Sequence, residues 1–263
     1  MTHGGPTRAH PSRLPPILCY HKVDPRLELG VTRIAPRRFA RQIERLAAAG
    51  WQALTWTAVV QCARGERTVG DRDIAITFDD GYRALRDHAF PVLAAQGWPS
   101  TCSVITDYAG KLNRWDIAYG GRRFAHLAWR DMRRWQSRGV HFISHTATHP
   151  RLTWLDERAV RDELERSRRA IGDALGIEPM VISYPFGAAG EREEQLAREC
   201  GYDAGFTLAG AWKGSPMAIA RTPVYMWAPP LPAVGRLRWI ERMGAVGAGR
   251  CAVGTSVLKG VRS

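Results

Sequence analysis

The chain has little cysteine and no long apolar run, and both absences restrict what it can be. Its five cysteines among 263 residues form no Cys-X-X-Cys pair and no dense set. This argues against a disulfide framework and favours reduced thiols in a cytoplasmic compartment. No stretch reaches the roughly 20 apolar residues that span a bilayer. Residues 1–16 are polar, with several prolines and glycines, and lack the apolar segment of a signal peptide. We therefore expect a cytoplasmic protein without a transmembrane helix.

Negative charge is also scarce, since 38 Lys and Arg stand against 25 Asp and Glu, a formal net charge of +13. Two interpretations stay open. The excess arginine can lie on solvated helix faces, or it can attract an anionic surface such as phosphorylated lipid headgroups. No known nucleic-acid-binding motif and no patterned basic helix is present, so we expect no nucleic-acid partner.

Strand and helix patterns alternate along the chain, which predicts a parallel sheet with helical crossovers. About seven such units favour a closed or nearly closed barrel over an open sheet, within one α/β domain at 17–232. We expect a flexible lead-in at 1–16 and a basic tail at 233–263. The expected strands are 17–21, 51–54, 73–78, 100–105, 140–143, 181–184, 203–207 and 219–226, and the expected helices are 38–49, one from about 57, 82–95, 129–138, 155–175 and 191–199.

Two adjacent carboxylates, Asp79 and Asp80, follow the strand expected at 73–78. They repel each other, so a cation or a shared proton is needed to hold both in one pocket. The alternative is that one or both cap the following helix, because Asp is a favoured N-cap residue. Barrels gather their chemistry where strands end, and every polar motif of this chain falls at such a position.

His145 and His149 follow another expected strand, four residues apart. A helical turn or a tight loop would bring both imidazoles to one ion. With 8 histidines in the chain a chance pair is the alternative. Their position, at the same end of the barrel as the aspartates, favours a ligand pair. Two His and one Asp with an open water position are typical of a catalytic zinc site.

Two further motifs end expected strands. Residues 183–187, Ser-Tyr-Pro-Phe-Gly, form either a shaped wall whose backbone N–H meets a developing oxyanion or an ordinary strand-to-helix turn. His21 ends the first strand, where it is either a catalyst or a satisfied core residue.

Taken together in chain order, these sequence motifs resemble those of the polysaccharide deacetylase family, also called the NodB-homology domain or carbohydrate esterase family four. Residues 77–81 (Thr-Phe-Asp-Asp-Gly) match its first motif, 144–149 match its metal-binding second motif, and 184–187 resemble its third. Residues 20–23 (Tyr-His-Lys-Val) resemble the opening of its bacterial exopolysaccharide and poly-N-acetylglucosamine branch. The similarity spans residues 17–226 and implies a distorted (β/α) barrel of about seven parallel strands in a single domain.

The resemblance also implies a site. A divalent metal, zinc first with cobalt or nickel as alternatives, is bound by Asp80, His145 and His149. The metal polarises a water and the acetyl carbonyl, Asp79 takes the proton of the water as general base, and the backbone N–H of Phe186 stabilises the oxyanion. A general acid must protonate the departing amine.

The chain departs from the family pattern at three positions. The usual late histidine is missing, since no His follows His149, so we assign the general acid to His21. The third motif lacks the arginine that orients the base in many members, and Ser183 stands near its place. His141 occupies a position where Glu is common.

Aromatic side chains suit a sugar-binding cleft, although most tryptophans are packing residues. Among the 10 tryptophans we assign Trp115 and Trp227 to substrate binding, together with Tyr184 and Pro185 of the third motif.

We therefore expect a metal-dependent carbohydrate N-deacetylase that acts on an amino sugar in a cell-envelope glycan, an exopolysaccharide or a lipid-linked saccharide. The alternatives are a deacylase of a small or secondary-metabolite glycoside, and a non-catalytic glycan-binding domain of the same fold. The complete set of Asp79, Asp80, His145 and His149 argues against the binding domain. The tail at 233–263 is predicted either as a basic amphipathic contact to the inner membrane face or as a final helix and a disordered end.

Overall fold

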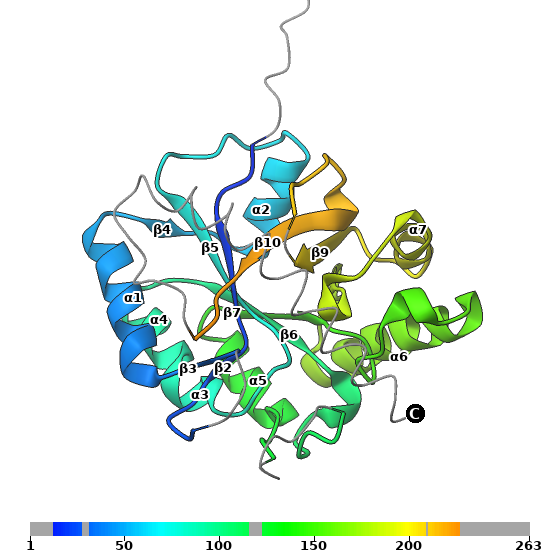
Figure 1. Cartoon of the computed structure of the whole chain (residues 1–263), viewed down its shortest axis with the longest axis horizontal. Coiled ribbons are helices and arrows are strands. Elements are labelled where there is room, and N and C mark those ends of the chain that lie inside the picture. Colours follow the sequence, from blue (N-terminus) through cyan, green and yellow to red (C-terminus); the bar gives the residue numbers. More distant parts are fainter. Residues whose placement is uncertain (1–12, 28–31, 116–122, 209, 227–263) are drawn as a thin grey trace, which may run out of the picture.

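A computed structural model describes residues 13–27, 32–115, 123–208 and 210–226. Strands occupy the centre and helices surround them (Figure 1). Seven parallel strands follow one another in chain order, and the first pairs with both the second and the last, which closes a barrel. The predicted α/β barrel of about seven parallel strands is confirmed. Its strands are β1 (Ile17–Tyr20), β5 (Asp73–Phe78), β6 (Ser100–Val104), β7 (Val140–Ser144), β8 (Val181–Ser183), β9 (Ala204–Leu208) and β10 (Ile219–Pro223).

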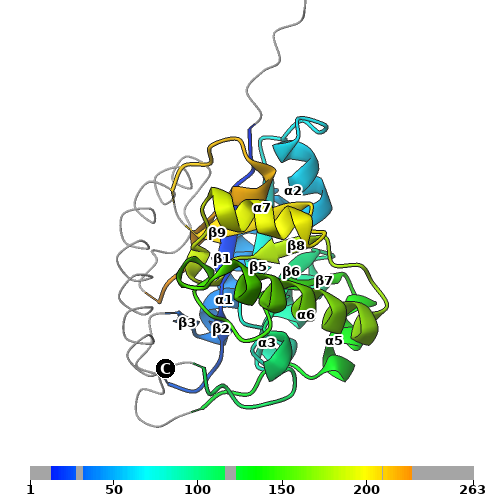
Figure 2. The same cartoon turned by 90° about the vertical axis from the view of Figure 1, so that its right-hand side faces the viewer.

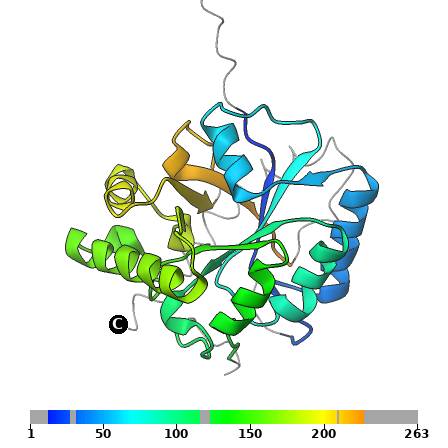
Figure 3. The same cartoon turned by 180° about the vertical axis from the view of Figure 1, so that it is seen from behind.

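The remaining elements lie around this barrel. Strand β4 (Gln52–Ala53) pairs with β5, and β2 (Lys22–Val23) pairs with β3 (Arg33–Ile34) in a separate two-stranded sheet. Seen from behind, the same ring of helices surrounds the strands (Figure 3). The helices are α1 (Pro36–Ala48), α2 (Trp56–Ala63), α3 (Leu85–His88), α4 (Phe90–Ala95), α5 (Trp129–Gln136), α6 (Glu157–Leu175) and α7 (Glu191–Glu199), and the 3₁₀ turns include η1 (Thr106–Tyr108), η3 (Leu152–Trp154), η4 (Pro185–Gly187) and η5 (Pro216–Ala218).

One expected helix was wrong in its extent. The segment 82–95 forms two short helices, α3 and α4, that meet at Ala89. Pro91 stands at the start of α4, where the missing N–H costs nothing, but it prevents one helix from running through both segments. The other expected helices are confirmed to within a few residues at their ends.

Helix α6 shows how local sequence sets an element. The side chain of Asp156 accepts the N–H of Ala159 at its start (2.8 Å), and Gly176 ends it in a left-handed conformation (φ 65°). Its buried face carries Val160, Leu164 and further apolar residues. That face packs on the barrel and on α7, which lies beside it (Figure 2).

The barrel interior changes from apolar to polar along its strands. Residues two apart on a strand share a face, and four of the seven strands, β1, β5, β8 and β10, contribute one residue to an apolar layer and a later one to a polar layer. The apolar layer is buried together with residues of α2. The polar layer therefore lies at the carboxyl ends of the strands. The successive inward residues are Ile17 and Cys19, Ala75 and Thr77, Val181 and Ser183, and Ile219 and Arg221.

Two expectations from the sequence concern residues at the ends of the chain. Most of the lead-in and all of the basic tail at 233–263 lie outside the described residues.

Within the described ranges, no helix is both long and apolar enough to cross a membrane. The described cysteines, namely Cys19, Cys62, Cys102 and Cys200, are free and buried.

Candidate active site

Three loops, at the carboxyl ends of β5, β7 and β8, contain the predicted motif residues. Asp80 Oδ1 lies 3.5 Å from His145 Nε2 and 3.6 Å from His149 Nε2. One ligand atom from each residue lies within 4.8 Å of the others, and all three side chains are buried. Zinc bonds of about 2.0–2.2 Å at tetrahedral angles separate neighbouring ligand atoms by about 3.3 Å. The three donors therefore fit one divalent cation.

Hydrogen bonding orients the first imidazole. The Nδ1–H of His145 donates to the carbonyl oxygen of Ser183 (2.6 Å), which leaves Nε2 facing Asp80. Metal-binding histidines are usually oriented by such an outer contact. Burial lowers the pKa of His145, but the Asp79 and Asp80 carboxylates outweigh it and raise the pKa above its usual value. For Asp80 the directions are reversed: burial raises the pKa of this carboxyl, yet the nearby histidines hold that pKa well below its ordinary range.

Backbone strain is concentrated in the same three loops. Among the described residues, the non-glycine positions with positive φ are Asp80 (69°), Thr146 (66°), His149 (69°) and Phe186 (61°). Such conformations cost roughly 1–3 kcal/mol each and cluster at functional sites. The strain falls on two of the three candidate ligands and on the residue assigned to the oxyanion, which supports the choice of these loops as the candidate site.

Glu163 of α6 holds the histidine loop, a role that the sequence analysis did not assign. Its buried carboxylate accepts the backbone N–H groups of Ala147 (2.9 Å) and Thr148 (2.8 Å) and the hydroxyl of Thr148 (2.6 Å). The signal was present in the sequence, because a glutamate stands among the core-facing positions of α6, between Val160 and Leu164.

The second carboxylate, Asp79, is paired with an arginine on β10. Arg221 Nη1 and Nη2 donate to Asp79 Oδ1 (2.8 Å) and Oδ2 (2.7 Å), and both side chains are buried. The hydroxyl of Ser103 and the thiol of Cys19 also donate to Asp79. Burial raises the pKa of Asp79, but Arg221 and His145 outweigh it, so its pKa lies well below the ordinary value. Asp79 is therefore a carboxylate at neutral pH.

The third motif has no arginine, and the arginine that contacts Asp79 comes from another strand. Arg221 Nη2 also donates to the hydroxyl of Ser183 (2.8 Å), the residue that stands near the expected arginine position. The sequence carried a signal here too, since Arg221 is a charged residue inside an expected strand.

His21, the residue assigned as general acid, lies beside Asp79. His21, Cys19 and Asp79 each place one ligand atom within 4.8 Å of the other two. Among the described residues, Nδ1 of His21 has no hydrogen-bond partner. Burial lowers the pKa of His21 more than the two aspartates raise it. The ring is therefore neutral at rest at neutral pH and has to gain a proton before it can act as an acid.

The third motif contributes differently from what we predicted. Tyr184 is 0% exposed and packs in a core cluster with Leu152 and Leu196, and Pro185 is also buried. Side chains alternate along a strand, so with Ser183 facing the barrel interior, Tyr184 faces the helices. The substrate-binding roles predicted for these two side chains are not supported. The ring of Phe186 lies 4.8 Å from that of His149.

The two assigned tryptophans have different outcomes. Trp115 is half-buried, and its ring centroid lies 4.1 Å from that of His149. Trp227 lies outside the described residues. Its assignment therefore stays a prediction, whereas Trp115 is placed at the site.

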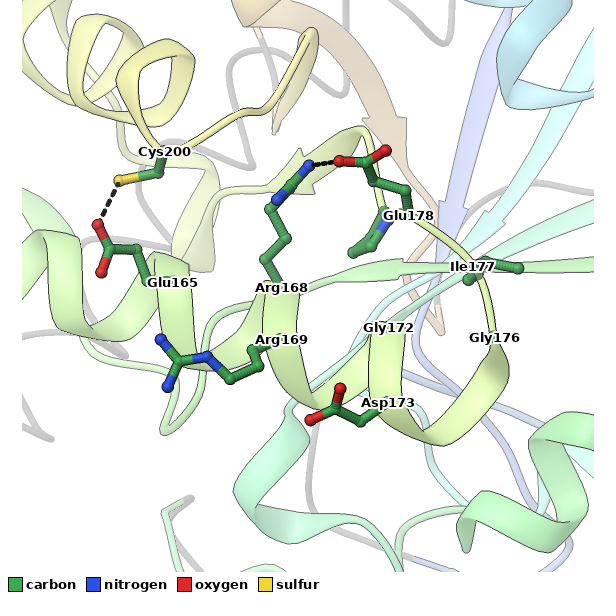
Figure 4. Close-up of a pocket in the computed structure, with 10 residues that line it drawn as sticks. Glu165, Arg168, Arg169, Gly172, Asp173, Gly176, Ile177, Glu178 and Cys200 are labelled. Carbon is green, nitrogen blue, oxygen red and sulfur yellow. Dashed lines mark hydrogen bonds and ion pairs between the residues drawn. The ribbon is translucent and has the colours of Figure 1, made fainter.

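A separate hollow of about 400 Å³ lies between α6 and the segment 176–179 (Figure 4). Two of its side-chain contacts are internal to the hollow: Arg168 forms an ion pair with Glu178, and the thiol of Cys200 donates to Glu165. It lies at the amino end of β8, whereas the motif residues lie at the carboxyl ends of the strands. The chemistry of the chain is therefore concentrated at the carboxyl end of the barrel.

The known proteins with similar sequences are named as deacetylases. A family model described as polysaccharide deacetylase matches residues 66–205. A Bacillus subtilis protein, YxkH, named as a polysaccharide deacetylase, is 27% identical over 197 residues, which is 75% of this chain and 65% of that protein. The poly-β-1,6-N-acetyl-D-glucosamine N-deacetylase of Escherichia coli is 22% identical over 190 residues, 60% of this chain and 28% of that protein. The matches thus span less than two thirds of either relative.

Solved structures share the fold. The deacetylase PplD of Streptococcus pyogenes superposes with a TM-score of 0.72 at 21% identity, over 82% of this chain and 94% of that one. IcaB from Ammonifex degensii gives a TM-score of 0.71 at 22% identity, over 88% of this chain and 96% of that one. At these identities the likeness concerns the fold.

Proposed function

The chain belongs to the polysaccharide deacetylase family, and we propose that it is a metal-dependent hydrolase that removes the N-acetyl group from an amino sugar in a glycan. One observation carries the proposal. A buried Asp80–His145–His149 donor set lies beside a second carboxylate, Asp79, that is held separately by Arg221. A glycan-binding domain has no need of a base beside a cation site.

The relatives support a substrate class. The E. coli relative is named for a polymer of β-1,6-linked N-acetylglucosamine. We infer an N-acetylated polysaccharide or a lipid-linked saccharide of the cell envelope as the substrate. Zinc is the first candidate for the cation held by Asp80, His145 and His149, and when bound it would lower the pKa of a water ligand and polarise the acetyl carbonyl.

Asp79 is the proposed general base. Arg221 keeps it anionic, so it is ready to accept the proton of the attacking water. A base with so low a pKa does not retain a proton. His21 lies next to Asp79, and its neutral ring is the proposed acceptor, which then passes the proton to the nitrogen of the departing amine. The proton that leaves the water thus ends on the amine.

The oxygen of the acetyl group needs a donor as it gains charge, and the backbone N–H of Phe186 is the proposed one. The turn that carries it is tightly packed. A Cβ at Gly187 would lie 2.3 Å from the backbone nitrogen of Leu208, so only glycine fits there. This packing supports a fixed left-handed conformation at Phe186.

Acetate release tests the proposal. The wild type and Asp79→Asn are assayed on N-acetylated oligosaccharides, lipid-linked sugars and small N-acetyl glycosides. We expect release that a chelator abolishes and that Asp79→Asn loses. Chelator-resistant release, or full activity of Asp79→Asn, contradicts the mechanism. His21→Gln should bind zinc normally yet turn over slowly, and unchanged turnover removes its assigned role.

Zinc content tests the ligand set apart from activity. Asp80→Ala and His145→Ala should each lose stoichiometric zinc. His141→Ala is the matched control, because this histidine lies on β7 just before the loop and outside the donor set. Retention of zinc by both ligand variants would refute the site.

A further inference from the structure

A histidine outside the family motifs, His126, links a candidate metal ligand to an aromatic side chain of the site. Its Nδ1 lies 2.7 Å from the carbonyl oxygen of Asp80. Its Nε2 lies 3.1 Å from Nε1 of Trp115. The side chain is 2% exposed, so water does not compete for either contact.

One protonation state satisfies both contacts. A carbonyl oxygen can only accept, so Nδ1 of His126 carries the proton and donates to Asp80. An indole nitrogen can only donate, so Nε2 of His126 is the acceptor for Trp115. His126 is therefore fixed as a neutral ring whose two nitrogens have different partners.

The surrounding chain holds this ring firmly. It is stacked on Tyr82, with centroids 5.0 Å apart and planes inclined by 20°. The backbone N–H of His126 donates to Lys111 (2.9 Å), and that of Leu127 donates to Gly81 (2.8 Å). His126 is thus anchored both to the loop that follows Asp80 and to the segment that leads to Trp115.

Trp115 in turn covers a ligand of the candidate cation site. Its ring centroid lies 4.1 Å from that of His149, and the indole is only half-buried, so part of it faces outward. Ligand sites are lined predominantly by apolar and aromatic side chains with a few placed polar groups, and an indole offers both an apolar face and a polar edge. The position of this wall depends on the indole N–H, which His126 accepts.

We propose that His126 is a positioning residue that sets Trp115 beside His149 as the wall against which the amino sugar binds. This inference rests on the proposed function. It assigns His126 to substrate affinity and not to the chemical step, because it contacts the substrate only through Trp115.

Substitution by amide side chains tests the two hydrogen bonds of the His126 ring separately. His126→Gln places an amide oxygen near the position of Nε2 and keeps an acceptor for Trp115. His126→Asn places an amide NH₂ near the position of Nδ1 and keeps the donor to Asp80, but it leaves Trp115 without an acceptor. Trp115→Phe keeps a ring and removes the indole N–H. Trp212→Phe is the matched control, since its indole N–H donates to Ser215 (2.9 Å) and its ring packs on the apolar cluster around Ile17.

The first readout is independent of activity. In ¹H–¹⁵N spectra of the zinc-loaded protein, the Trp115 indole signal is identified by its loss in Trp115→Phe. We expect this signal to shift and to exchange faster with solvent in His126→Asn, and to stay protected in His126→Gln. Zinc content stays at the wild-type level in all variants. An unchanged Trp115 signal in His126→Asn overturns the proposal.

The second readout is the split between KM and kcat for the glycan that the wild type deacetylates. Losing one neutral hydrogen bond worth ~0.5–1.5 kcal/mol corresponds to about a two- to twelvefold change. We expect His126→Asn and Trp115→Phe to raise KM by this factor with kcat nearly unchanged, and the double variant to be no worse than either alone. Trp212→Phe should keep the wild-type KM.

The outcomes are distinguishable. A fall in kcat together with zinc content, at unchanged KM, would mean that His126 acts on the metal loop, and it would overturn the proposal. If His126→Asn fails to fold, Trp115→Phe makes the same test from the other side of the hydrogen bond. Absence of acetate release by the wild type would refute the proposed function instead, and the indole signal would still decide whether His126 sets Trp115.

Discussion

Replacing Arg221 with methionine removes one partner of the buried Asp79–Arg221 pair while it roughly conserves side-chain length. The exposed fraction is 0% for the Arg221 side chain and 1% for that of Asp79. No water reaches the carboxylate to replace the missing guanidinium. The variant therefore leaves a charge buried in the barrel with only hydroxyl and thiol donors around it.

The magnitude follows from the hydrogen bonds that the guanidinium makes. A guanidinium has five N–H donors, and those of Arg221 reach Asp79, Ser183 (2.8 Å), Thr77 (3.3 Å) and the carbonyl of Thr207 (3.3 Å). Removing one partner of a buried ion pair costs about 3–5 kcal/mol. Because folded proteins are stable by only about 5–15 kcal/mol, we expect Arg221→Met to lose a large part of the free energy of unfolding.

Urea denaturation followed by circular dichroism measures the effect. Asp79→Asn combined with Arg221→Met should be more stable than Arg221→Met alone, because the double variant leaves no unpaired charge at position 79. Arg166→Met is the matched control, since Arg166 pairs with Asp162 and Asp107 at 41% side-chain exposure. Exposed pairs contribute about 0–1 kcal/mol, so this variant should stay near wild-type stability.

Two results would refute this reasoning. A loss below about 1 kcal/mol for Arg221→Met would show that the carboxylate needs no buried counter-charge. A double variant no more stable than Arg221→Met would show that the loss comes from the packing of the arginine and not from the unpaired charge.

Two further predictions concern the cation site. Glu163→Gln replaces a carboxylate that holds the histidine loop, so zinc affinity should fall about 10–100-fold. Competition with a chromophoric chelator measures this affinity, and Asp173→Asn on the exposed side of α6 is the control. Equal zinc affinity of Glu163→Gln and the wild type contradicts the role of Glu163. The raised pKa of His145 makes two quantities depend on pH in opposite directions, namely the stability of the metal-free protein and its affinity for zinc. Without metal, its proton stabilises the fold below about pH 6.5, and this contribution is lost as pH rises through the folded pKa. Zinc must displace that proton, so zinc affinity should fall by up to about tenfold per pH unit below the folded pKa of His145. A flat profile would refute this.

Much of the fold could be predicted from the sequence, because the patterns that indicate strands and helices are local. The strands were predicted from apolar runs between helical patterns, and residues 73–78 form a strand with the bounds predicted. Since all the motif loops follow parallel strands, their convergence on one end of the barrel followed without coordinates. Asp80, His145 and His149 were therefore predictable as neighbours.

Side-chain direction was less predictable, because it reverses with every residue along a strand. Ser183 faces Asp79 inside the barrel, so its neighbour Tyr184 packs under the helices instead of against a substrate. Nothing in the run 181–184 distinguishes these two assignments, since a shift of one residue exchanges the faces.

The sequence by itself determined the alternation of strands and helices, the barrel it implies and the three motif loops, because each depends on residues close in the chain. Tertiary structure alone decided which residues support them. Arg221 lies 142 residues from Asp79 and reaches it only because β10 pairs with β1 and closes the barrel. Glu163 and His126 likewise meet the motif loops through packing between distant segments. Such contacts result from the closure and register of the whole barrel, a sum of many weak interactions that no local pattern records.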